Sequence, residues 1–298
     1  AYVSKLLPND TNRVTKVEED AGGKGINCSR MLKELGGQTK AVAFLGGDSG
    51  EYIKLVLTKS EIPFISIETQ APTRTTVAVE ELASVPPTTF NEPGGPIHHK
   101  ELVDLLEVVK DVSRESSYVL FGGSVPLGLN HDIYKVLIQI AENSGAKAVL
   151  DADGEALVEG IKSKPFMIKP NWQEAERLLN TSFESKSDVV RGAFEIAKMG
   201  IELVIISLGK QGCVACYEDF VYDVSSPMVK PQSTIGSGDS LIAGVLYGLE
   251  NGMNIEDCLK LGSACGAATA MTNGTEIGNK KDVDKLINQV KISKIAEL

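Results

Sequence analysis

The feature that most constrains the fold of this chain is a repeated alternation of short β-branched runs with longer segments of helical periodicity. Segment 99–111 shows the helical pattern, because its leucines and Val109 recur on one apolar stripe. Such alternation is typical of a parallel, doubly wound α/β sheet that is covered on both faces and binds ligands beyond the carboxyl ends of its strands. It predicts strands at 40–45, 117–121, 146–151, 166–169 and 202–207, and further helices at 130–143, 171–179 and 187–199.

Two stretches, 1–20 and 72–93, interrupt this rhythm with short alternating runs punctuated by Pro, Asn and Asp. We expect them to form a few antiparallel strands outside the main sheet, as a small β lid. Inserted strands often cover a site, and their free edges favour pairing with a second copy of the chain. The rest of the chain, 21–71 and 94–298, then forms the α/β domain.

Composition argues against several classes of function. The 298 residues include 30 Lys and Arg against 40 Asp and Glu, a net charge of −10 that repels nucleic acid. The longest apolar runs, such as 203–208, are far shorter than the roughly 18 residues of a membrane span. Five scattered cysteines predict a reducing cytoplasm as the location. The pair Cys213 and Cys216 has no second pair to complete a metal site, so both are expected to be structural strand residues.

The strongest functional signal is the run TIGSGDSLIAG at 234–244, in which glycines lead directly into an apolar helix. Such a turn directs several backbone N–H groups to one point at a helix N-terminus, where the helix dipole adds positive potential. The run therefore predicts an anion hole. Asp239 lies in the first turn beside it and is placed to accept a proton from a hydroxyl. A structural interpretation, in which Asp239 caps the helix and Gly236 and Gly238 make a turn, explains the same residues.

A second glycine cluster, AGGKGIN at 21–27, precedes a helix that ends at Gly36 and Gly37. The glycines let backbone approach a ligand closely, while Lys24 and Asn27 supply a cation and an amide. The cluster lacks the P-loop pattern, and a plain tight turn is the alternative.

Two further runs, KPNWQE at 169–174 and SLGKQG at 207–212, end predicted strands. Asn171 and Glu174 have the spacing of a capping box, which alone explains their types. The functional alternative is that both organise water around Mg²⁺, which prefers oxygen ligands and retains several waters.

Taken in this order, the four motifs resemble those of the ribokinase-like, or PfkB, carbohydrate kinase family, over essentially the whole chain. The runs NRV at 12–14 and GGSVPLGL at 122–129 are similar to the phosphosugar branch, which includes 1-phosphofructokinases, tagatose-6-phosphate kinases and minor 6-phosphofructokinases. The resemblance implies a three-layer α/β/α fold with a mainly parallel central sheet and a β lid that clasps a second subunit. It also implies ATP- and Mg²⁺-dependent phosphorylation of a ketohexose phosphate: fructose 1-phosphate, tagatose 6-phosphate or fructose 6-phosphate.

The resemblance also implies roles for single residues. Asp239 is the catalytic base, and Asn171 with Glu174 holds magnesium through water. On the substrate side, the resemblance implies that Gly23, Lys24 and Asn27 contact the sugar and that Arg74 binds the sugar phosphate. Ser124, in the run GSVP, lies in a loop that the resemblance also places at the substrate. The residues implied for the anion hole and the nucleotide are Gly236, Ser237, Gly238, Lys169, Ser207, Gly209, Gly212 and Asn273.

Two alternatives remain open. One is a kinase of an unphosphorylated sugar or a nucleoside, in which Arg74 is only an exposed lid residue. The other is a non-catalytic sensor of sugar phosphate or nucleotide, which would keep the glycines but need no base, so Asp239 within an intact GSGD run argues against it. A departure from the family also bears on activity, since relatives begin with a strand that carries a substrate-binding aspartate. Asp10 and Asp20 lie at the wrong motif positions to replace this aspartate. Without the strand that carries it, we expect the sheet to lack one member and the site to lack one substrate contact.

Overall fold

The computed structural model describes residues 1–81 and 87–295. Within them, three sheets form. The strands are β1 (Tyr2–Val3), β2 (Ala41–Leu45), β3 (Phe64–Glu68), β4 (Thr76–Glu81), β5 (Thr88–Asn91), β6 (Tyr118–Gly122), β7 (Lys147–Asp151), β8 (Met167–Ile168), β9 (Leu203–Ser207), β10 (Cys213–Tyr217), β11 (Phe220–Val224) and β12 (Ile292–Ile295). The largest sheet has the order β12-β11-β10-β9-β8-β7-β6, while β2 pairs with β3 and β1-β4-β5 form a separate sheet.

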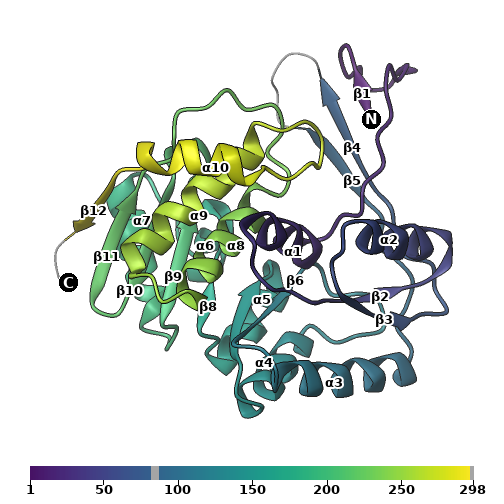
Figure 1. Cartoon of the computed structure of the whole chain (residues 1–298), viewed down its shortest axis with the longest axis horizontal. Coiled ribbons are helices and arrows are strands. Elements are labelled where there is room, and N and C mark those ends of the chain that lie inside the picture. Colours follow the sequence, from purple (N-terminus) through teal and green to yellow (C-terminus); the bar gives the residue numbers. More distant parts are fainter. Residues whose placement is uncertain (82–86, 296–298) are drawn as a thin grey trace.

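The main sheet is mixed in direction. Strands β6 to β9 pair in parallel, as the alternating pattern predicts. The last three strands pair in antiparallel fashion, because β10 and β11 form a hairpin and β12 returns along its outer edge. In Figure 1, β12 lies at one end of the molecule and the β1-β4-β5 sheet projects from the other.

Helices cover both faces of the main sheet (Figure 1). Buried side chains of the sheet alternate between two apolar clusters, so that Leu203 and Ile205 pack with α1, α8, α9 and α10, whereas Val204 and Ile206 pack with α4 and α7 on the other face. The helices are α1 (Lys24–Leu35), α2 (Gly47–Lys59), α3 (His99–Ser113), α4 (Ile133–Asn143), α5 (Gly154–Gly160), α6 (Trp172–Leu179), α7 (Lys186–Ala197), α8 (Ser237–Glu250), α9 (Ile255–Ala270) and α10 (Lys280–Leu286).

The same alternation explains the CxxC pair. Cys213 and Cys216 lie on β10, are buried, and belong to clusters on opposite faces of the sheet. Both thiols are free, so the prediction of structural strand cysteines is confirmed. Within the described part of the chain, no helix combines the length and apolar character needed to cross a bilayer.

Helix α8 is held against α9 by close backbone contact. A Cβ atom on Gly244 would lie 2.8 Å from Gly262 Cα, and one on Gly262 would lie 2.8 Å from Leu241 O, so only glycine fits at either position. Because the GSGD turn begins α8, this contact fixes the turn relative to the core.

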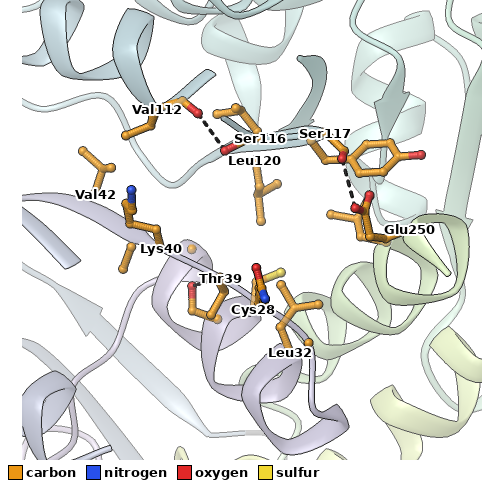
Figure 2. A pocket seen from close by; sticks show the side chains of 18 of the residues that line it. Cys28, Leu32, Thr39, Lys40, Val42, Val112, Ser116, Ser117, Leu120 and Glu250 are labelled. Atoms are coloured by element: carbon orange, nitrogen blue, oxygen red, sulfur yellow. Dashed lines mark hydrogen bonds between the residues drawn. The ribbon is translucent and has the colours of Figure 1, made fainter. Parts of the chain in front are cut away.

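The expected interruption of the sheet is present between β6 and β2. Strand β6 pairs with β7 along one edge, β2 pairs with β3 along one edge, and their other edges have no strand partner among the described residues. A cavity of about 770 Å³ separates them, lined by residues such as Val42, Val112 and Leu120. Figure 2 shows this cavity between β2, β6 and α1, with Ser117 and Glu250 hydrogen-bonded at its rim.

The strand and helix predictions agree with the structure at each segment named from the sequence, to within a few residues at the ends. Helices α2, α5 and α10 and strands β3 and β12 were not predicted. The region expected to form the lid contains β1, β4 and β5, although only Tyr2 and Val3 of residues 1–20 form a strand. Strands β4 and β5 pair in antiparallel fashion as predicted, whereas β1 pairs with β4 in parallel, so the prediction of antiparallel pairing was wrong for β1. Residues 82–86 of the expected lid lie outside the described part of the chain.

Candidate active site

The GSGD turn forms the N-terminus of α8, as predicted. Gly236 precedes the helix with φ 76°, a left-handed conformation that favours glycine, and Asp239 lies in the first turn. The first N–H groups of a helix have no partner within it, so they face the space in front of Ser237 and Gly238. Asp239 is only 8% exposed despite its charge.

Asn27 contacts Asp239 directly. Its Nδ2 donates a hydrogen bond of 2.8 Å to Asp239 Oδ2, which joins the first turns of α1 and α8. Burial raises the pKa of Asp239 above its ordinary value, the hydrogen bond from Asn27 opposes that shift, and the nearby charge of Asp151 adds to it. The carboxylate is therefore a stronger base than an exposed aspartate.

Two lysines lie close to this carboxylate. Lys24 begins α1 after Gly23, whose φ of 123° requires glycine, and Lys169 directly follows β8. A Cβ atom on Gly238 would lie 3.1 Å from Lys169 Nζ, so the ammonium group occupies the mouth of α8. A phosphate in front of α8 would meet two cations as well as the N–H groups of the helix.

The sequence interpretation missed Asp151, the last residue of β7. Its side chain is 1% exposed, and its Oδ1 lies 3.0 Å from Lys24 Nζ and 3.6 Å from Lys169 Nζ. The only signal in the sequence is the position of an aspartate at the carboxyl end of a predicted strand, the place where such a sheet binds ligands.

Unsatisfied polar atoms gather here. Among the residues that the structure describes, the buried side-chain polar atoms without a hydrogen-bond partner are Asn27 Oδ1, both carboxylate oxygens of Asp151, and Ser237 Oγ. A folded protein keeps such atoms rarely, because each costs desolvation free energy. Their concentration around Asp239 marks this place as a binding site.

The predicted magnesium residues form a capping box at the start of α6. Asn171 Oδ1 accepts a 2.9 Å hydrogen bond from the Glu174 backbone N–H, and Glu174 Oε2 accepts one of 2.7 Å in return. Within the described residues no group of three His, Cys, Asp or Glu side chains could hold a metal directly. Each carboxylate oxygen has two lone pairs, so Glu174 retains acceptor capacity and fits contact with Mg²⁺ through water.

Three of the remaining predicted nucleotide residues lie at the end of β9 and in the turn that follows it, whereas Asn273 lies after α9. Asn171 pairs with Ser207 as an isolated bridge, and Gly209 and Gly212 both have positive φ in the turn that follows. A Cβ atom on Gly212 would lie 1.9 Å from Val224 O, so packing alone explains that glycine. Asn273 is exposed just after α9, where its backbone O accepts a hydrogen bond from Glu276.

The residues predicted to bind the sugar phosphate, Arg74 and Ser124, are hydrogen-bonded to each other where the lid joins the main domain. Arg74, just before β4, donates a 2.6 Å hydrogen bond from Nη1 to Ser124 Oγ in the loop after β6. Both residues are exposed, so the guanidinium is open to solvent and to an anion.

Comparison with known proteins places this arrangement in one family. Residues 1–282 match the family model described as pfkB family carbohydrate kinase. A 1-phosphofructokinase of Bacillus subtilis is 32% identical over 294 residues, which cover 99% of this chain and 95% of that protein. A 1-phosphofructokinase of Borreliella burgdorferi is 33% identical over 276 residues, which cover 92% of this chain and 88% of that protein. Phosphofructokinase-2 of Escherichia coli, solved in complex with substrates and products, is 30% identical with a TM-score of 0.89, covering 96% of this chain and 94% of that one. The chain belongs to the pfkB family of carbohydrate kinases, which transfer phosphate to an alcohol group.

Proposed function

We propose that this kinase transfers the terminal phosphoryl group of ATP to a hydroxyl of a ketohexose phosphate and so produces a bisphosphate. The observation that carries the proposal is the buried carboxylate of Asp239, held by Asn27 in the first turn of a helix beside Lys169. The two 1-phosphofructokinases and phosphofructokinase-2 act on substrates of this class, as their names state.

In the proposed step, the substrate hydroxyl oxygen attacks the terminal phosphorus and its proton passes to Asp239. The bond between that phosphorus and the oxygen of ADP breaks, and its electron pair leaves with ADP. Phosphoryl transfer needs charge neutralisation and positioning more than covalent help, which suits the N–H groups of 236–238 and the ammonium groups of Lys24 and Lys169. Asn171 and Glu174 would hold Mg²⁺ through water, and the ion would neutralise charge on the phosphates of ATP.

Arg74 and Ser124 support a phosphorylated acceptor. A guanidinium binds phosphate with two parallel hydrogen bonds, and a neutral sugar would leave it without that partner. Gly23 and Asn27, at the start of α1, are proposed to contact the sugar between this phosphate and Asp239. Ser207, Gly209, Gly212 and Asn273 are proposed to line the nucleotide.

A substrate panel tests the proposal. We expect ADP release that requires both ATP and Mg²⁺ and that is stimulated by fructose 1-phosphate, fructose 6-phosphate or tagatose 6-phosphate. The corresponding free sugars and nucleosides should have kcat/KM values lower by a factor of about 10⁴. Equal use of free sugars would favour the unphosphorylated-sugar kinase, and binding without turnover would favour the sensor.

The lid supports a proposed homodimer. Val77 on β4 and Phe90 on β5 are directly paired and 43% and 58% exposed, so they place an apolar patch on one face of the β1-β4-β5 sheet. Phe90→Asp should shift the sedimentation coefficient from dimer to monomer, whereas Val103→Asp, at an exposed apolar residue on α3, should not. A monomeric wild-type protein would refute this assembly.

A further inference from the structure

One carboxylate oxygen joins two cations that come from opposite sides of the site. Asp151 Oδ1 contacts Lys24 Nζ at 3.0 Å and Lys169 Nζ at 3.6 Å. Lys24 begins α1, on the proposed sugar side, whereas Lys169 follows β8, on the proposed nucleotide side. Asp151 itself ends β7, which lies beside β8 in the main sheet.

Close packing fixes where both lysine side chains run. A Cβ atom on Gly122 would lie 3.4 Å from Lys24 Cβ, and a Cβ atom on Gly238 would lie 3.1 Å from Lys169 Nζ. Lys169 is 6% exposed and Lys24 33% exposed, so neither ammonium group is freely hydrated. Two half-desolvated positive charges that share one small space repel each other unless an anion lies between them.

Asp151 supplies that anion. Burial is the largest single influence on the pKa of Lys24 and lowers it. The charge and the hydrogen bond of Asp151, together with nearby carboxylates, outweigh burial, so the net result is a pKa above the ordinary lysine value. The other charged groups that face Lys24 are Glu174 from α6, Asp239 from α8 and Asp153, which follows β7, and the influence of each is smaller than that of Asp151. The second oxygen of Asp151 has no hydrogen-bond partner among the described residues, which is unusual for a carboxylate that serves only to stabilise the fold.

We propose that Asp151 is a positioning residue that holds the ammonium groups of Lys24 and Lys169 together on the path of the transferred phosphoryl group. The inference rests on the proposed kinase function and adds a residue that acts through the two lysines. Its negative charge and its position are both required, and two variants separate these requirements.

The first variant is Asp151→Asn, which removes the charge and keeps the shape. We expect kcat to fall by about 10- to 100-fold, while KM for ATP and for the phosphosugar changes by less than about threefold, because the lysines act mainly on charge that develops during transfer. The matched control is Asp153→Asn in the same loop. Asp153 is 53% exposed, pairs with Arg177 and caps α5, a role that asparagine also performs, so kcat should stay within about twofold of wild type.

The second measurement needs no substrate. Nuclear magnetic resonance of the Lys24 side chain should show its pKa falling by about one unit or more in Asp151→Asn and falling far less in Asp153→Asn, because Asp153 is exposed and acts more weakly on Lys24. Asp151→Glu keeps the charge but displaces it by one methylene, so the pKa of Lys24 should stay high while kcat falls by about three- to tenfold. If Asp151→Asn does not fold, Asp151→Glu decides alone, since a wild-type kcat in this variant contradicts the positioning role.

The two proposals fail in different ways. An unchanged Lys24 pKa in folded Asp151→Asn would overturn the role of Asp151, even if the wild-type enzyme phosphorylates sugar phosphates as proposed. A wild-type protein that fails to turn over any phosphosugar would overturn the proposed function, whatever the titration of Lys24 shows.

Discussion

Substitution of Asp239 by asparagine separates its chemical role from its structural one. An asparagine at this position still offers an oxygen to Asn27 Nδ2, so the 2.8 Å hydrogen bond between α1 and α8 is retained. The change removes only the negative charge and the ability to accept a proton. General base catalysis contributes about 10²- to 10⁴-fold, so we expect kcat to fall by this factor, equivalent to about 3–5 kcal/mol of transition-state stabilisation. KM for ATP should change by less than about twofold.

Stability should change in the opposite direction. The pKa of Asp239 is raised in the folded protein, chiefly by burial, so the folded state binds this proton more tightly than the unfolded state does. Stability is therefore lost as the pH rises from the ordinary aspartate pKa through the raised one, and Asp239→Asn should unfold at a higher temperature than wild type at pH 7. The difference should vanish at a pH below the ordinary aspartate pKa.

Coupled spectrophotometric detection of ADP and thermal unfolding at pH 3.5 and pH 7 measure both effects. Asp257→Asn is the matched control, because Asp257 is also an acid in the first turn of a helix but is 45% exposed. It should leave kcat within about twofold of wild type. An Asp239→Asn enzyme with kcat within about tenfold of wild type would refute the assignment of the base.

Three further predictions concern other parts of the molecule. Arg74→Ala should raise KM for the phosphosugar by about tenfold or more and leave KM for ATP nearly unchanged, and steady-state kinetics that show equal effects would contradict a phosphate-binding role. The Cβ atom of Gly209→Ala would meet no atom within 4 Å, so this change should lower the free energy of unfolding in denaturant by about 1 kcal/mol. The Cβ atom of Gly212→Ala would lie 1.9 Å from Val224 O, so this change should lower it by more than about 3 kcal/mol. Similar losses in the two variants would refute the packing argument. In hydrogen exchange, the β6 amides that face the cavity should exchange faster than those paired with β7, and uniform protection along β6 would indicate that this edge is covered.

Much of the fold follows from local pattern. The parallel strands β6, β7, β8 and β9 are short β-branched runs between amphipathic helices, and periodicity is sufficient to find them. Strand β3 escaped prediction because its sequence, FISIE, includes Ser66 and Glu68, and only one of its five residues is buried. Helix α2 escaped because just two of its residues, Gly50 and Leu57, are buried, which leaves a weak apolar stripe.

The candidate site was predictable where its residues belong to short contiguous motifs, such as the glycine runs and KPNWQE at 169–174. Gly236, Gly238 and Asp239 form a contiguous run, and their placement at a helix N-terminus follows from local rules. Asp151 belongs to no motif. Its importance arises because β7 lies beside β8, which brings it near Lys169, and because α1 returns across the end of the sheet with Lys24. Contacts of this kind depend on tertiary structure and have no local signal.

The buried charges of the site should lower the free energy of unfolding of the protein. Asp151 keeps Lys24 positive, but its charge also raises the pKa of Asp239, which burial has already raised. The same carboxylate therefore supports an electropositive lysine pair and a stronger base at the mouth of α8, while its Oδ2 has no hydrogen-bond partner among the described residues. Electrostatic preorganisation of this kind favours the charge distribution of phosphoryl transfer over that of the resting protein. Neutralisation of Asp239 by asparagine, which keeps its shape and its partner, should accordingly stabilise the resting protein and slow the reaction together.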